Sequence, residues 1–218
     1  MLNPKDYIGI SFWLISIAMF ATSLFLVLER KNVDNKWNTS ISISIIITAI
    51  AAIHYQFMKH IWITTNNTPV TYRYVDWFLT VPLQIIEFYV LLSISNKIPK
   101  LLFVKLLVAS IFMLIFGYLG EIGVIKKEYG FILGTLFWLY IIYVIFFGEI
   151  KKIRDETDDT SVIFAVDCLK WIISIGWLIY PIGYLLKTKN LIFVYNIGDF
   201  VNKILFCLII WYAAKYKN

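Results

Sequence analysis

The chain has 218 residues, of which 60% are hydrophobic and only 16% are charged, and its mean hydropathy is +0.76. A soluble domain is about 45–50% apolar and about 25% charged, and one of this size could not hide so much apolar surface. The composition therefore excludes a disordered chain, a disulfide scaffold and a soluble nucleic-acid-binding protein, and it indicates an integral membrane protein. We attribute the net charge of +6 to loops that fix the membrane topology, not to a nucleic-acid partner.

Seven apolar segments follow one another along the chain, each close to the length of about 20 residues that a helix needs to cross a bilayer. The predicted spans are residues 7–28, 38–58, 71–94, 101–125, 129–147, 161–186 and 191–215. The first is too long for the core of a signal peptide, so we expect it to be retained as a span. Segments of this length exceed barrel strands, and the bilayer excludes irregular backbone, so the spans should be helices. The sequence predicts an all-α membrane protein with one domain over residues 1–218.

The connections and the cysteines carry less information. Residues 64–69 are polar and predict a loop, and residues 148–160, the most hydrophilic stretch, predict a solvated loop. Cys168 and Cys207 both lie in apolar stretches, where we interpret them as small packing residues. We expect no metal site and no second domain.

Lysines and arginines predict the orientation of the spans. If the N-terminus is outside, twelve of these residues lie at cytoplasmic ends: Arg30, Lys31, Lys36, Lys97, Lys100, Lys105, Lys151, Lys152, Arg154, Lys170, Lys215 and Lys217. Six lie on the outer side: Lys5, Lys59, Lys126, Lys127, Lys187 and Lys189. Because cytoplasmic loops carry the excess of Lys and Arg, the bias predicts an outer N-terminus and a cytoplasmic C-terminus.

Several ionisable residues lie within the predicted spans, where each costs at least about 2.5–3.5 kcal/mol. They are Arg73, Asp76 and Glu87 in the third span, Asp199 and Lys203 in the seventh, His54 in the second and Glu121 near the outer end of the fourth. Asp199 and Lys203 are four residues apart and share one helix face. Asp76 and Glu87 are eleven residues apart, which returns them to nearly the same face about 16 Å apart.

The simplest neutral arrangement of these groups pairs Arg73 and Lys203 with Asp76 and Asp199. Glu87 then has no cation, so we expect its protonated form. A structural ion cluster that positions the helices is the alternative. That alternative leaves the lysine unexplained, because a desolvated amine is costly and is a good Schiff-base nucleophile.

Four segments carry a resemblance to a known family. They read YRYVDWFLTVPLQIIEFY at 72–89, GYLGE at 117–121, GWLIYPIGY at 176–184 and YNIGDFVNKILFCLIIW at 195–211. They resemble the microbial (type 1) rhodopsins, specifically the proteorhodopsins, and the likeness runs from Tyr7 to the C-terminus. It implies a seven-helix protein of a prokaryotic inner (plasma) membrane, surrounded by the lipid bilayer, with all-trans retinal bound covalently as a protonated Schiff base.

The resemblance also implies roles for the buried charges. Lys203 matches the chromophore-attachment lysine, Asp76 the primary counterion and proton acceptor, and Asp199 the second counterion. Glu87 matches the cytoplasmic proton donor and Arg73 the arginine below the acceptor. Asp76, Thr80 and Glu87 together resemble the set found in outward proton pumps, with Thr80 beside the acceptor.

Further residues match the surroundings of the chromophore. The retinal-lining matches are Trp77, Met113, Trp138, Trp177 and Tyr180. Pro181 should kink the sixth span and free a backbone carbonyl. Gln84 matches the colour-tuning position and implies blue absorption, because an amide near the polyene would stabilise the ground-state charge distribution.

Three more matches concern the edge of the site. His54 matches a histidine that hydrogen-bonds the acceptor carboxylate, and Trp13 a residue that approaches this histidine from a neighbouring subunit. A homo-oligomer, pentamer or hexamer, is therefore expected. Glu121 matches either the outer proton-release region or a carboxylate at the membrane rim.

The sequence thus predicts a light-driven outward proton pump that absorbs blue light, and not a substrate-converting enzyme. The first alternative is a slow-cycling retinal photosensor that signals to a partner. The second is a seven-helix receptor or scaffold without photochemistry, which would leave Lys203 and its carboxylates unexplained.

Overall fold

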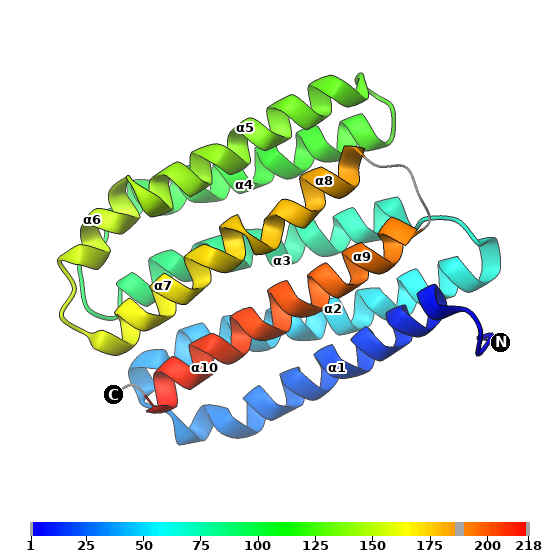
Figure 1. The fold of residues 1–218 in the computed structure, drawn as a ribbon. Helices are drawn as coiled ribbons and strands as arrows, with labels where there is room; N and C mark the ends of the chain where they lie inside the picture. The colour runs from blue at the N-terminus through cyan, green and yellow to red at the C-terminus, as the bar shows by residue number, and fades with distance from the viewer. Residues whose placement is uncertain (1, 186–189, 217–218) are drawn as a thin grey trace.

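The computed structural model describes residues 2–185 and 190–216, and within them it contains seven helical segments long and apolar enough to cross a membrane. These segments lie side by side in one bundle (Figure 1). The first five are α1 (Tyr7–Glu29), α2 (Asn38–Thr65), α3 (Val70–Leu92), α4 (Lys100–Glu121) and α5 (Lys127–Phe146). Short 3₁₀ turns, η1 (Arg30–Asn32) and η2 (Asn35–Trp37), join α1 to α2. The seven-helix prediction is confirmed.

The sixth and seventh segments are interrupted. The sixth consists of α7 (Thr160–Ser174), the 3₁₀ turn η3 (Gly176–Leu178) and α8 (Ile179–Leu185). The seventh consists of α9 (Asn190–Asp199), the π-helical segment η4 (Phe200–Leu205) and α10 (Phe206–Tyr216). The interruption of the seventh segment was not expected. A kink was expected in the sixth, and its 3₁₀ turn contains Trp177, four residues before Pro181. The proline leaves the carbonyl of Trp177 without its helical donor. Residues 186–189, including the predicted span end at Leu186 and the loop residues Lys187 and Lys189, lie outside the described residues, as does Lys217.

Two predicted loops are partly helical, which corrects the sequence interpretation. The helix α2 continues to Thr65, where the polar side chains do not interrupt it because Thr64 and Thr65 donate their hydroxyls to carbonyls of their own helix. Asn66 ends it in the left-handed conformation, with φ of 54°, which asparagine tolerates well.

The second correction concerns residues 148–160. Residues 149–155 form α6 (Glu149–Asp155). Its Ile150 is buried, and Lys151 pairs with Asp155 one turn later at 2.5 Å. A buried apolar contact together with this pair accounts for a helical turn within a hydrophilic stretch.

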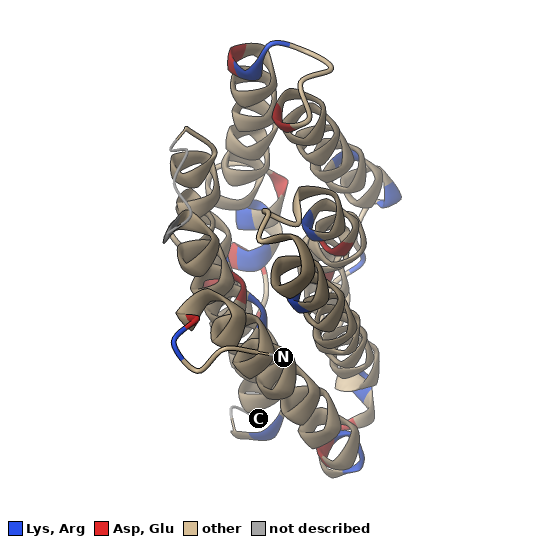
Figure 2. Ribbon diagram, turned by 90° about the vertical axis from the view of Figure 1, so that its right-hand side faces the viewer, with Lys and Arg blue, Asp and Glu red and all other residues tan. Residues whose placement is uncertain are grey.

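The outer surface of the bundle is apolar. Large side chains such as Leu14, Phe20, Leu136 and Ile182 are about half exposed or more. Figure 2 shows Lys, Arg, Asp and Glu as short coloured stretches of otherwise tan helices, many of them near the helix ends and a few in the middle of the bundle. An apolar outer surface is suited to contact with the hydrocarbon of a bilayer. The charged side chains buried inside the bundle therefore need a separate explanation.

Candidate functional site

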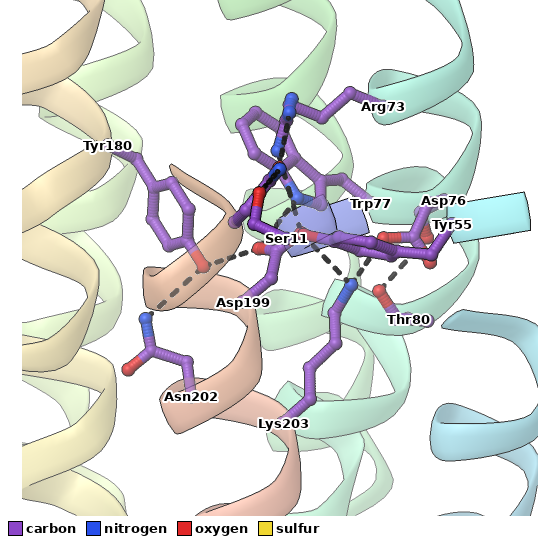
Figure 3. Close-up of polar contacts among 11 residues, drawn as sticks. Ser11, Tyr55, Arg73, Asp76, Trp77, Thr80, Tyr180, Asp199, Asn202 and Lys203 are labelled. Atoms are coloured by element: carbon purple, nitrogen blue, oxygen red, sulfur yellow. Dashed lines mark hydrogen bonds and ion pairs between the residues drawn. The ribbon is translucent and has the colours of Figure 1, made fainter. Parts of the chain in front are cut away.

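Lys203 lies in the interior of the bundle, on the π-helical segment η4. Its side chain is 2% exposed, and its Nζ pairs with the Oδ2 atom of Asp76 from α3. Nζ also lies 3.6 Å from Oδ2 of Asp199, one turn earlier in its own span. Figure 3 shows the lysine side chain extending toward both carboxylates. One buried amine thus joins the third and seventh spans.

Arg73 supplies a second buried cation. Its Nη1 lies 3.8 Å from Oδ2 of Asp199, and its Nη2 donates to Oδ1 of Asn196 at 3.0 Å. The amide of Asn196 in turn donates to Ser11 on α1 at 2.9 Å. Arg73 and Lys203 therefore pair with two buried carboxylates, as the neutral arrangement predicts.

The two carboxylates have very different surroundings. Asp199 accepts hydrogen bonds from the hydroxyl of Tyr55 at 2.7 Å, the hydroxyl of Tyr180 at 2.6 Å and the indole N–H of Trp77 at 3.2 Å. Asp76 has Lys203 on Oδ2, whereas its Oδ1 has no hydrogen-bond partner among the described residues. Thr80 donates to the backbone carbonyl of Asp76, at 2.9 Å, and not to its carboxylate. Asp199 is held by several donors, and Asp76 has a free oxygen.

The hydrogen bond expected between His54 and Asp76 does not appear among the described residues. Nδ1 of His54 is buried without a partner in the described part of the chain, and so is Oδ1 of Asp76. His54 is half-buried on α2 and lies near enough to the Asp76 carboxyl to act on it electrostatically. His54 therefore lies near Asp76 without a hydrogen bond to it among the described residues, and its role as a partner of the acceptor stays a prediction.

Glu87 lies further along α3, away from the ion cluster. It is completely buried, and neither carboxyl oxygen has a hydrogen-bond partner in the described residues. It is eleven positions after Asp76 on the helix, or about 16 Å along the axis. The third span therefore presents one acid paired with the lysine and a second, unpaired acid on nearly the same face.

A cavity of about 110 Å³ leads to Lys203. It is lined by all seven residues expected around a chromophore: Trp77, Gln84, Met113, Trp138, Trp177, Tyr180 and Pro181. Gly134 lines it as well, where a Cβ atom would approach the carbonyl of Met113 to 3.2 Å, so the glycine allows α4 and α5 to pack closely. The cavity has aromatic walls, and at its end the amine of Lys203 lies between two carboxylates. This arrangement fits a long apolar aldehyde bound covalently to Lys203.

The remaining candidates lie at the margins. Glu121 also lines this cavity and a neighbouring one at the end of the bundle. Trp13 is 47% exposed on α1. Cys207 is buried and its Sγ lies 3.5 Å from the carbonyl of Ser44.

Sequence reasoning missed several members of the site. Tyr55, Asn196 and Asn202 are buried and hydrogen-bonded to the cluster or its neighbours. Asn196 and Asn202 could have been found as amides within an apolar span. Tyr55 carried no such signal, because tyrosine is common throughout this chain.

Comparison with known proteins agrees with this geometry. A family described as "Bacteriorhodopsin-like protein" matches residues 6–216. A green-light absorbing proteorhodopsin of Gamma-proteobacterium EBAC31A08 is 44% identical, and a blue-light absorbing proteorhodopsin of Gamma-proteobacterium Hot 75m4 is 43% identical. Each alignment covers 100% of this chain and 90% of the relative.

Solved structures agree as well. The crystal structure of blue light-absorbing proteorhodopsin from Med12 superposes with a TM-score of 0.86 at 41% identity, over 98% of this chain and 100% of that one. Xanthorhodopsin, described as a light-driven ion pump with dual chromophore, gives a TM-score of 0.84 at 25% identity, over 99% and 96% of the two chains. Family membership implies retinal bound through a Schiff base, which the lysine-ended cavity fits. The chain belongs to the bacteriorhodopsin-like family of seven-helix membrane proteins, and its relatives at 43–44% identity are proteorhodopsins.

Proposed function

We propose that this chain is a light-driven outward proton pump with all-trans retinal on Lys203 as a protonated Schiff base, in a single domain over residues 1–218. The observation that carries the proposal is the placement of Lys203. Its Nζ is paired with Asp76, and Glu87 lies on the same span toward the opposite end of the helix. A proton held at Nζ thus has an acid on each side along the third span.

Asp76 is the proton acceptor in this proposal. Asp199 accepts three hydrogen bonds and lies near both Arg73 and Lys203, and donors of this kind favour the charged form of a carboxylate. Oδ1 of Asp76 can take a proton without displacing a donor. Asp199 therefore remains the fixed counterion, while Asp76 changes its protonation state.

Glu87 is the proton donor. A carboxyl group buried without a cation, with the hydroxyl of Ser40 as its polar neighbour, is far more stable with its proton than without it. Bound retinal supplies the light-driven isomerisation that changes the surroundings of Nζ. The proton at Nζ then passes to Asp76, and the proton of Glu87 restores the one lost from Lys203.

The outward direction follows from the proposed topology. With the N-terminus outside, α3 runs from the outer side to the cytoplasm, so Asp76 lies in its outer half and Glu87 in its inner half. A proton released from Asp76 leaves outward, and Glu87 is recharged from the cytoplasm. One turnover moves one proton out of the cell.

Gln84 supports blue absorption. It lines the cavity beside Lys203, where its amide dipole stabilises the ground-state distribution of charge and raises the excitation energy. Identity does not separate the colours, because the green- and blue-absorbing relatives are 44% and 43% identical. The colour proposal therefore depends on this one side chain.

We place the pump in the plasma membrane of a prokaryote as a homo-oligomer, pentamer or hexamer. The exposed indole of Trp13 on α1 is the proposed contact with the neighbouring subunit, close to the span that carries His54. In the family this activity is transport, so the chain acts as a transporter and not as a substrate-converting enzyme.

The direct test of the site is Lys203→Ala in membranes supplied with all-trans retinal. The wild-type protein should become coloured and the variant should not, because it lacks the amine. Lys170→Ala is the matched control: this lysine lies on α7, pairs with Asp167 and does not line the cavity. A visible pigment of unchanged intensity in Lys203→Ala would refute the assignment.

A further inference from the structure

Asn202 immediately precedes Lys203 and is 2% exposed. Its side-chain amide donates to the backbone carbonyl of Gly176 at 2.9 Å and to the hydroxyl of Tyr180 at 3.2 Å. Its own backbone carbonyl accepts a hydrogen bond from the amide of Gln84 at 3.0 Å. One buried residue therefore joins the third, sixth and seventh spans beside the lysine.

The contacts of Asn202 connect the two interruptions of the bundle. Gly176 is the first residue of η3, where the sixth span departs from the α-helix, and Asn202 lies within the π-helical segment η4. A Cβ atom at Gly176 would lie 2.2 Å from Oδ1 of Asn202, so this close approach requires glycine. π-helical turns are rare and are frequently found at functional sites.

The hydrogen bonds continue to the counterion. Tyr180 accepts from Asn202 and donates its own hydroxyl proton to Asp199 at 2.6 Å, as Figure 3 shows. The path therefore runs from the backbone of the sixth span, through Asn202 and Tyr180, to a carboxylate 3.6 Å from Nζ of Lys203. A movement of the sixth span at Gly176 would therefore affect Lys203 in two ways. It would move the backbone of the π-helical turn that carries the lysine, and it would move the counterion Asp199.

From these contacts we infer that Asn202 is a positioning residue for Lys203. Its side chain fastens the π-helical turn to the break at Gly176, and Gln84 holds the same turn from the third span. Together they fix the rotation of this turn about the helix axis, and so the direction in which Lys203 points toward Asp76. The effect on the chromophore rests on the proposed function, whereas the Gly176–Asn202 contact itself does not.

The contact is tested first in the protein without retinal. In Gly176→Ala the new methyl group collides with the amide of Asn202, and the melting temperature should fall by roughly 2–12 °C. In the double variant Gly176→Ala/Asn202→Ala the collision is gone, so adding Gly176→Ala to Asn202→Ala should lower the melting temperature little further. Such non-additivity is the signature of direct contact. Two losses that add independently would overturn the inference.

The effect on Lys203 is tested with all-trans retinal as the probe. Asn202→Ala removes two hydrogen bonds that hold the turn, so pigment formation should slow by roughly 5–30-fold and the visible absorption maximum should shift. Val201→Ala is the matched control, because this residue lies in the same π-helical segment and is 43% exposed. It should leave both the rate and the spectrum unchanged.

Two outcomes separate this inference from the proposed function. A folded Asn202→Ala protein with the rate and spectrum of the wild type would overturn the positioning role. If the wild-type protein formed no pigment at all, the proposed function would fail, while the melting experiment would still report on the contact.

Discussion

At the scale of single residues, two buried aspartates beside one lysine have different partners. Asp199 accepts three hydrogen bonds, and Asp76 keeps one oxygen without a partner in the described residues. The sequence predicted that both acids and both cations would meet, because spacing along a helix places side chains on faces. Only the family resemblance ranked the two acids, because the donors to Asp199 come from three other spans and spacing within one helix does not reveal them.

Glu87→Gln tests the donor. Glutamine keeps the size of the side chain but has no acidic proton, so the return of a proton to Lys203 after a flash should slow by roughly 100-fold or more at pH 7. The decay of the deprotonated pigment in flash photolysis measures this rate. Glu156→Gln is the control, because Glu156 is an exposed carboxylate of the loop before α7. Equal decay rates in Glu87→Gln and the wild type would contradict the donor role.

Gln84→Leu tests the colour proposal. Loss of the amide dipole near Lys203 should move the absorption maximum of the pigment to longer wavelength, toward green. Gln56→Leu serves as the control, because Gln56 bonds to Ser16 outside the cavity and should leave the spectrum unaltered. A maximum that stays in place, or moves to shorter wavelength, in Gln84→Leu argues against the proposed tuning.

At the scale of the elements, length and polarity located the spans but not their internal form. The π-helical turn at Lys203 and the break at Gly176 are stabilised by side chains from other helices, Gln84 and Asn202 among them. Trp138 on α5 likewise donates to the carbonyl of Ile173, just before the break. The pattern of apolar residues within one segment does not reveal partners that come from other helices. The predicted end of the second span was wrong for a local reason instead. The hydroxyl of Thr65 bonds to a carbonyl of its own helix, so the helix continues through a polar stretch.

Asp159 tests how one of these elements begins. Its carboxylate accepts from the N–H groups of Ser161 and Val162 at the start of α7 and pairs with Lys36 at 2.9 Å. In Asp159→Ala the loss of this cap should lower the free energy of unfolding by about 0.5–2 kcal/mol. The ion pair adds little, because Lys36 is 38% exposed. Asp158→Ala, at the exposed neighbouring aspartate, should have almost no effect on thermal unfolding.

The contribution of Asp159 also depends on pH. Burial raises the pKa of its carboxyl, but the hydrogen bonds from Lys36, Val162 and Ser161 outweigh burial and lower the pKa overall. The stabilisation is therefore fully present above the unfolded pKa of about 3.9 and is lost as pH falls through the lower, folded pKa. The difference in melting temperature between wild type and Asp159→Ala should shrink as the pH falls from 7 toward 3. A difference that grows on acidification would contradict this cause.

At the scale of the whole molecule, the fold and the family could be predicted from the sequence. Composition indicated a membrane protein, and the motifs around Asp76 and Lys203 pointed to the rhodopsins, which the match over residues 6–216 confirms. The hydrogen bond expected between His54 and Asp76 does not appear among the described residues, although His54 acts on Asp76 electrostatically, and this partnership stays a prediction. A motif identifies which residue occupies a position, while the direction of its side chain depends on packing.

The orientation of the bundle stays a prediction of its Lys and Arg distribution, and the pumping direction depends on it. The central claim is most directly tested by the external pH of retinal-supplied cells that express this chain, under blue light, with and without an uncoupler. We predict light-dependent acidification of the medium that the uncoupler abolishes. Alkalinisation would contradict the outward direction, and coloured cells with no pH change would contradict the pump and favour a photosensor.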